Sequence, residues 1–109
     1  MLSGLFSRRN INQGVAAWAA TAGAVLLDVR TEEEYAAGHI DGSLNIPLHS
    51  MDAIENWVSD KNAAIFVYCQ SGARSAGAAG LLKSKGYRRV TDIGGIRGYR
   101  CLLYTSRCV

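Results

Sequence analysis

Two nearly continuous runs of apolar residues stand out along the chain, at 24–29 and 64–68. Runs of this length with almost no polar position are typical of strands buried on both faces, as in a parallel sheet. Shorter apolar segments at 43–46 and 90–93 predict two further strands, and 10–12 predicts a short edge strand.

Helical segments alternate with these strands. Thr31 and Glu34 have the spacing of a capping box at a helix start, and Gly86 suits the left-handed position just past a helix end. The helices that such signals predict span 13–21, 31–38, 50–58 and 74–85. Strands separated by helices pair in parallel. We therefore expect an α/β fold with a small parallel sheet of about five strands, flanked by helices on both faces.

Length and composition narrow the class of protein. The chain has 109 residues, of which 49% are hydrophobic and 19% charged, so we expect one globular domain. The net charge of +3 is too small to indicate nucleic-acid binding, although 28–60 holds eight acidic residues and one basic, whereas 83–107 holds seven basic and one acidic. No stretch of about 18 apolar residues is present, so no contact with a membrane is expected.

The cysteines and the N-terminal sequence bear on localisation. Three cysteines, two of them within 101–109, do not make a disulfide framework, so a reduced, cytoplasmic protein is expected. Arg8 and Arg9 precede an uncharged stretch that resembles a signal peptide. The apolar core of that stretch is weak, and its removal would take away a helix that the fold uses, so secretion is kept only as the alternative.

The segment Cys69–Ser75 carries the most chemical information. It follows the apolar run 64–68 and precedes a predicted helix, and open parallel sheets bind ligands beyond the carboxyl ends of their strands. A short glycine-containing loop there can turn backbone N–H groups inward, the helix start adds its positive end, and Arg74 adds a full charge. All three favour a thiolate, so Cys69 is predicted to have a lowered pKa and to act as a nucleophile. A buried, inert cysteine is the alternative.

Four motifs, in order, resemble those of a known family. They are Leu27-Asp28-Val29-Arg30 followed by Glu34-Tyr35, Gly38-His39-Ile40 with Gly42–Pro47, Val67-Tyr68-Cys69 with the loop to Arg74-Ser75, and Gly86-Tyr87 followed by Val90 and Gly94-Gly95-Ile96. Through them the chain resembles the single-domain rhodaneses, which are thiosulfate-type sulfurtransferases. The resemblance divides the chain into an N-terminal extension (1–9), a rhodanese domain (10–100) and a tail that matches nothing in the family (101–109).

The resemblance implies a reaction. In such proteins the cysteine takes a sulfane sulfur from a donor such as thiosulfate or a persulfide and becomes a persulfide itself. A thiol (glutathione, thioredoxin or a protein thiol) or cyanide then accepts the sulfur. Cys69 would be the catalytic residue, and the anion-binding loop around it would consist of Gln70, Ser71, Gly72, Ala73, Arg74 and Ser75. No cofactor is implied, and the histidines, His39 and His49, have no cysteine pair beside them that would complete a metal-ligand set.

Three further residues are expected to support the site. Asp28 ends a buried strand, where its carboxylate would bond loop amides or balance Arg74. Arg30 would pair with Glu34 across one helical turn, as the family pattern suggests, and His39 would orient a neighbouring loop. A structural role is expected for Asp28, Arg30 and His39, with direct chemistry as the alternative.

Loop length separates the candidate activities. Four residues stand between Cys69 and Arg74, whereas the related Cys-dependent phosphatases and arsenate reductases have one more, which widens the loop enough for a tetrahedral oxyanion. The shorter loop favours sulfur transfer. A non-catalytic binding module is the alternative from another class, but such rhodanese-like domains have lost the cysteine that this chain keeps.

The tail 101–109 departs from the family pattern. Two interpretations stay open: an artefact of translated sequencing read-through, or a genuine tail whose Cys101 resolves a persulfide on Cys69 as a disulfide.

Overall fold

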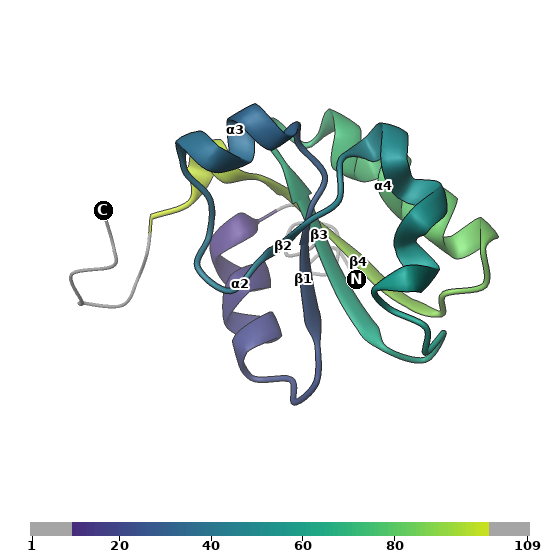
Figure 1. Ribbon diagram of the computed structural model, residues 1–109. Helices are drawn as coiled ribbons and strands as arrows, with labels where there is room; N and C mark the ends of the chain where they lie inside the picture. The colour runs from purple at the N-terminus through teal and green to yellow at the C-terminus, as the bar shows by residue number, and fades with distance from the viewer. Residues whose placement is uncertain (1–9, 101–109) are drawn as a thin grey trace.

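A four-stranded parallel sheet, in the order β2-β1-β3-β4, forms the centre of the molecule (Figure 1). The computed structural model describes residues 10–100. The strands are β1 (Val25–Asp28), β2 (Leu44–Asn45), β3 (Ala64–Cys69) and β4 (Arg89–Gly95). The helices are α2 (Ile11–Ala19), α3 (Glu32–Ala37) and α4 (Ala73–Ser84), with two 3-10 segments, η1 (Leu48–Asn56) and η2 (Ile96–Gly98).

The expected α/β fold is confirmed, but the expected edge strand at 10–12 is wrong. Asn10 is instead the N-cap of α2, and its Oδ1 accepts hydrogen bonds from the backbone N–H groups of Asn12 (3.0 Å) and Gln13 (3.2 Å). Asparagine is among the strongest N-cap residues, so the helix begins where the apolar pattern predicts a strand. The described residues therefore form four strands rather than five.

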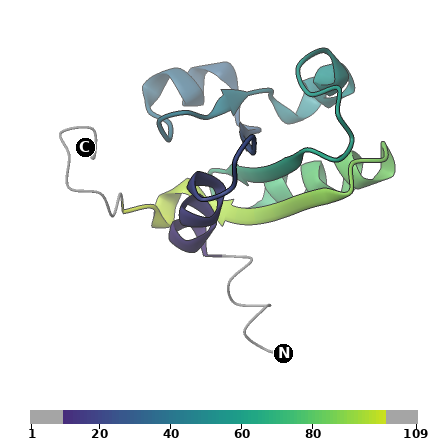
Figure 2. The ribbon, with the colours of Figure 1, turned by 90° about the horizontal axis from the view of Figure 1, so that it is seen from below.

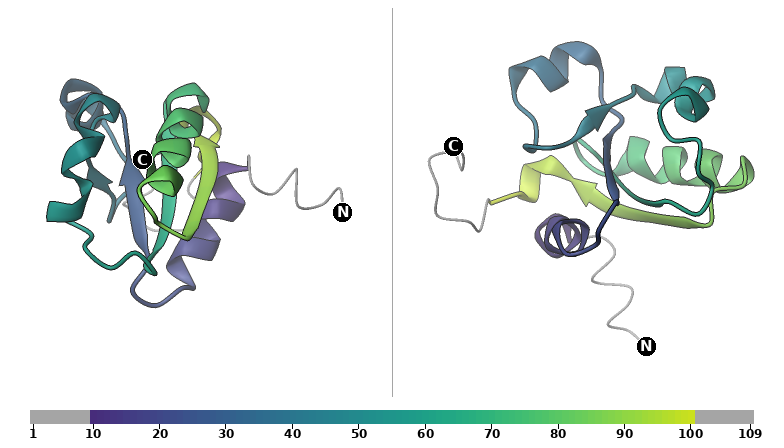
Figure 3. Two further views of the ribbon diagram at one scale, coloured as in Figure 1. Left: turned by 90° about the vertical axis from the view of Figure 1, so that its right-hand side faces the viewer. Right: turned by 60° about the horizontal axis from the view of Figure 1, so that its bottom comes forward.

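Helices cover both faces of the sheet, as expected. Figures 2 and 3 show α2 on one face, with α4 and η1 on the other. Along β3, Tyr68 faces α2, whereas Val67 and Cys69 belong to the apolar cluster under α4 and η1. Both faces of the strand are thus buried, which is why the sequence of β3 shows no polar alternation.

Helix α2 lies unusually close to β4. A Cβ atom at Gly14 would stand 2.3 Å from Cγ2 of Ile93, whose side chain is fully buried. Glycine at this position therefore sets the distance between the helix and the sheet.

The predicted helix ends are partly right. Gly86 adopts a φ of 100° after α4, and the N–H of Tyr87 reaches back to the carbonyl of Leu82 (3.1 Å), which completes the expected left-handed helix end. The predicted helix over 50–58 is wrong in type and start. The segment is the 3-10 helix η1, which begins at Leu48 and has non-helical angles at Ser50.

A bulge interrupts the pairing of β3 with β4. Val67 pairs with Asp92 and Tyr68 with Gly94, so Ile93 is the extra residue. Gly94 has a φ of 93°, and its N–H donates to Oδ1 of Asp92 (3.0 Å). Beyond the bulge, Gly95 pairs with Cys69 at the carboxyl edge of the sheet. Helix α3 lies beyond this edge in Figure 1.

Among residues 10–100 there is no helix with both the length and the apolar character needed to cross a membrane.

Candidate active site

Cys69 is the last residue of β3, and α4 begins only four positions later. The intervening loop turns sharply at Gly72, whose φ of 105° lies in the left-handed region that favours glycine. This turn directs the N–H of Gly72 at the sulfur of Cys69, which accepts the hydrogen bond at 3.0 Å. Strand, loop and helix start therefore hold the sulfur in the position that the sequence predicts.

The surroundings of Cys69 favour its thiolate. The residue is only 1% exposed, and this burial taken alone raises the pKa of the thiol. Hydrogen bonds from the backbone and hydroxyl of Ser75, and from the backbone N–H groups of Gly72 and Ser71, outweigh the burial, so that the pKa is lowered overall. The backbone donors expected from the sequence are present, and the Ser75 hydroxyl joins them.

Ser75 connects the loop to β4. Its side chain is fully buried, and its Oγ lies 2.7 Å from Oδ1 of Asp92 and 3.0 Å from the carbonyl oxygen of Gly72. A hydroxyl has one proton, so these acceptors and the Cys69 sulfur share a single donor. Asp92 is absent from the residues that the sequence singles out, because nothing in a lone acidic residue on a strand indicates its neighbour on a helix.

The expected ion pairs exchange partners. Arg74 is held by Glu34 of α3 through two hydrogen bonds, of 2.8 and 2.9 Å, and forms no ion pair with Asp28. The Asp28 carboxylate does accept a backbone amide, the N–H of Arg30 (2.9 Å), as expected. Arg30 is held by Asp28, with its Nε 3.1 Å and its Nη2 2.8 Å from the carboxylate, and therefore does not pair with Glu34. The four side chains are those that the sequence nominates, but the pairing depends on where α3 docks.

Glu34 is fixed from two directions. Its carboxylate accepts from the guanidinium of Arg74 and from the backbone N–H of Thr31, the N-cap of α3 (2.9 Å). The Arg74 hydrogen bonds and then the Thr31 N–H lower the pKa of Glu34 to about 2. The predicted capping box is therefore present. Its glutamate also anchors Arg74, so the guanidinium of Arg74 is paired with Glu34 and does not contact the sulfur of Cys69.

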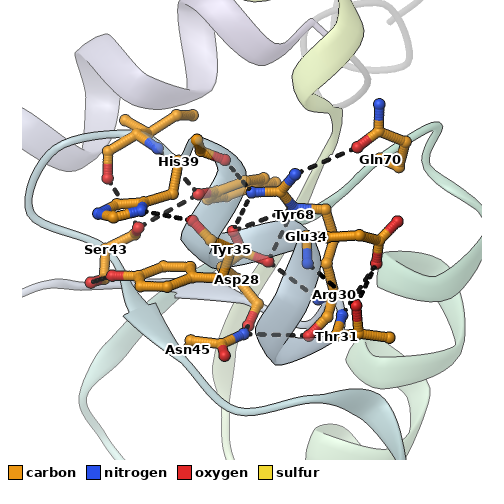
Figure 4. A network of polar contacts seen from close by, with 12 residues as sticks. Asp28, Arg30, Thr31, Glu34, Tyr35, His39, Ser43, Asn45, Tyr68 and Gln70 are labelled. Carbon is orange, nitrogen blue, oxygen red and sulfur yellow. Dashed lines mark hydrogen bonds and ion pairs between the residues drawn. The ribbon is translucent and has the colours of Figure 1, made fainter.

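Arg30 is the centre of a buried polar network, shown in Figure 4. Its guanidinium is almost fully buried, and besides Asp28 it donates to the carbonyl of Gly38 (2.7 Å) and to Oε1 of Gln70 (3.1 Å). The side-chain amide of Asn45 holds the backbone of the same segment, because it donates to the carbonyls of Asp28 and Arg30 (3.0 Å each). The network fixes the side chain of Gln70, the first residue after Cys69.

His39 and Tyr68 support this network without touching the sulfur. The Nδ1 of His39 lies 2.8 Å from the carbonyl of Tyr35, so this nitrogen carries a proton and donates it, and the two rings stack 3.7 Å apart. The hydroxyl of Tyr68 accepts from the N–H of Ile40 (3.1 Å) and donates to Ser43. Tyr68, interpreted from the sequence only as strand packing, therefore binds the segment after α3 to β3.

The loop rests directly on the end of β4. A Cβ atom at Gly95 would stand 2.5 Å from the carbonyl oxygen of Gln70 and 2.8 Å from Cα of Ser71. The same carbonyl of Gln70 accepts the N–H of Arg97 (3.3 Å), the second residue of η2. The loop can pack this closely against β4 only because position 95 has no side chain.

Two open grooves border the loop. One lies between the start of α2, the loop and η2, and the other between Arg30, Glu34 and the end of α3. Gln70 and Arg97 line both. Between residues 10 and 100, acidic, histidine and cysteine side chains do not gather in groups of three or more that would hold a metal ion.

Comparison with known proteins shows which family has this sequence and fold. The family model of the rhodanese-like domain matches residues 12–100. The chain belongs to the rhodanese-like family. It is 39% identical over 72 residues to the thiosulfate sulfurtransferase PspE of Escherichia coli (strain K12), covering 65% of this chain and 69% of that protein. It is 40% identical over 74 residues to the thiosulfate sulfurtransferase GlpE of Pseudomonas entomophila (strain L48), covering 67% of this chain and 66% of that protein.

The likeness extends to the fold of this rhodanese-like domain. A solved rhodanese with anions from E. coli superimposes with a TM-score of 0.67 at 36% identity, over 70% of this chain and 91% of that one. The expected family and fold are both confirmed. The protein is a rhodanese-like sulfurtransferase.

Proposed function

We propose that this rhodanese-like domain moves sulfane sulfur through a persulfide on Cys69. The observation that carries the proposal is the position of Sγ, buried at the end of β3 and 3.0 Å from a backbone N–H, with donors that lower the pKa of the thiol. The thiolate that these donors stabilise is the nucleophilic form of a cysteine. The same donors suit the negative charge of a persulfide.

The proposed cycle needs no oxidant and no cofactor. The Cys69 thiolate attacks the sulfane sulfur of thiosulfate, the S–S bond of thiosulfate breaks, and sulfite leaves with the bonding electrons. An acceptor thiolate then attacks the outer sulfur of the Cys69 persulfide. The acceptor leaves as a persulfide, or as thiocyanate where cyanide is the acceptor, and the Cys69 thiolate is restored.

The donor and the acceptor are part of the proposal. PspE and GlpE, the relatives described above, are thiosulfate sulfurtransferases, which supports thiosulfate or a persulfide as the donor. Glutathione, thioredoxin, a protein thiol or cyanide is the proposed acceptor. The cytoplasm stays the predicted location.

The length of the loop weighs against the phosphatase alternative. Four residues stand between Cys69 and Arg74, one fewer than in the related phosphatases, which leaves less room for a tetrahedral phosphate. The short loop therefore favours a single sulfur atom at this position.

Intact mass spectrometry tests the proposal. After treatment with thiosulfate, the protein is expected to gain the mass of one sulfur atom, and dithiothreitol is expected to remove it. Cys69→Ser should not gain the sulfur, while its circular dichroism spectrum stays that of the unchanged protein. Faster hydrolysis of an aryl phosphate than transfer of sulfur, on the same preparation, would replace the proposed activity with a phosphatase.

A further inference from the structure

The first of the two grooves, of about 570 Å³, opens beside the loop that follows Cys69. Its walls are the start of α2 with Asn10 and Asn12, the loop residue Ser71, and η2 with Arg97. The side chain of Asn12 spans the two outer walls, because its Nδ2 donates to the carbonyl of Gly98 (2.9 Å) and its Oδ1 accepts from the N–H of Arg100 (2.9 Å). The groove is therefore held in shape by contacts of α2 with η2 and with the residues that follow η2.

The charges at the mouth of the site are almost all neutralised. Arg30 is paired with Asp28, and Arg74 with Glu34. Arg97 differs from both: in the described range 10–100 its guanidinium has no ion pair, and its side chain is exposed. It is thus the uncompensated cation of the two grooves.

The backbone of Arg97 is nevertheless fixed relative to the loop. Its N–H donates to the carbonyl of Gln70, and Gly95 packs against the same part of the loop. A free guanidinium on a fixed backbone, close to the residues that follow the nucleophile, is suited to meet a charged group that enters the groove.

We propose that Arg97 binds the negatively charged end of the sulfur donor in the first groove, and so selects donors of higher negative charge. The proposal rests on the proposed function. The first groove is favoured over the second because its lining contains no acidic side chain, whereas the second contains the carboxylate of Glu34. In thiosulfate, Arg97 would hold the sulfonate end, which departs as sulfite when the Cys69 thiolate takes the outer sulfur.

A pair of donors that differ in charge tests this selection. Thiosulfate carries two negative charges and methanethiosulfonate one, with the same sulfur-to-sulfone linkage. For Arg97→Gln we expect the KM for thiosulfate to rise about fivefold, the value for one exposed ion pair, with a smaller rise for methanethiosulfonate and little change in kcat. Arg97→Lys should recover part of the loss.

Arg100→Gln is the matched control, because it removes the same charge from an exposed residue of the same segment that does not line either groove. We expect its KM for thiosulfate to stay within about twofold of the unchanged protein. Equal effects of Arg97→Gln and Arg100→Gln, or equal rises for the two donors, would overturn the proposal.

A binding measurement separates this proposal from the proposed function. In Cys69→Ser, which has no nucleophile, thiosulfate is titrated while the amide signals of Gln70 and Ser71 are followed by NMR. Adding Arg97→Gln to this variant should weaken the dissociation constant about fivefold, and adding Arg100→Gln should not. Unchanged binding after Arg97→Gln would refute the role of Arg97. Failure of the unchanged protein to gain sulfur from either donor would refute the persulfide cycle instead.

Discussion

The hydroxyl of Ser75 shows how much of the chemistry at Cys69 depends on one proton. Its oxygen lies within hydrogen-bond distance of a carboxylate on β4 and of a carbonyl in the loop, and it is also among the donors that lower the pKa of Cys69. A carboxylate attracts a proton more strongly than a neutral acceptor does. Asp92 therefore competes with the thiolate for this proton.

Asp92→Asn is expected to lower the pKa of Cys69 further. The amide can donate to Ser75 Oγ, which frees the hydroxyl proton for the thiolate, and the negative charge beside the site is lost. Because the thiolate predominates above the pKa, the pH range of reactivity should extend downward. The rate of alkylation by iodoacetamide against pH measures the shift. Ser75→Ala is the opposite control, with a pKa above that of the unchanged protein, and an identical profile for all three proteins would contradict the competition.

At the scale of single residues, the sequence does not reveal which charged side chains form ion pairs with each other. Asp28, Arg30, Glu34 and Arg74 are all visible as charged residues at strand and helix ends. Their pairing is not, because Arg74 and Glu34 are 40 positions apart and meet only when α3 docks over the loop. Asp92 escapes sequence analysis for the same reason.

At the scale of elements, the local signals are the ones that predict correctly. The capping box of α3, the glycine after α4 and the apolar run of β3 each depend on neighbours within a few positions, and all three are present. At Asn10 two local signals compete, and the N-cap preference prevails over the strand pattern. The second error is at η1, which takes a 3-10 form and begins before the helix start expected at Ser50.

The contact of α2 with β4 gives an element-scale prediction. Gly14→Ala is expected to destabilise the fold by about 1–3 kcal/mol, because its methyl group would overlap the buried side chain of Ile93. Gly80→Ala in α4 is the matched control. Gly80 is exposed with open space around it, so alanine there should stabilise by about 0.5–1 kcal/mol through helix propensity. Urea unfolding measures both, and equal stabilities for the two variants would show that α2 can move away from β4.

At the scale of the whole molecule, charge is divided across the sheet. The acidic segment 28–60 accompanies β1, β2 and η1, whereas the basic residues between 83 and 100 accompany β4 at the other edge. Arg97 and the first groove lie on the basic side, at the end of β4. An anionic donor is therefore attracted toward this side of the molecule.

Salt should weaken this attraction. We expect the second-order rate constant for persulfide formation from thiosulfate to fall steadily between about 0.01 M and about 1 M salt, as the Debye length shortens from about 30 Å to about 3 Å. Alkylation of Cys69 by iodoacetamide, which is neutral, is the comparison and should hardly change. Parallel salt dependences for the two reagents would mean that the charge of the donor does not assist its approach.

The contact between Gly95 and the loop also determines how the binding site could be enlarged by evolution or by design. The loop backbone already presses against β4 so closely that even a methyl group at position 95 would collide with Gln70 and Ser71. An inserted loop residue has no room on that side. A larger loop, of the length that accommodates a tetrahedral oxyanion, would have to expand on the side that faces away from Gly95.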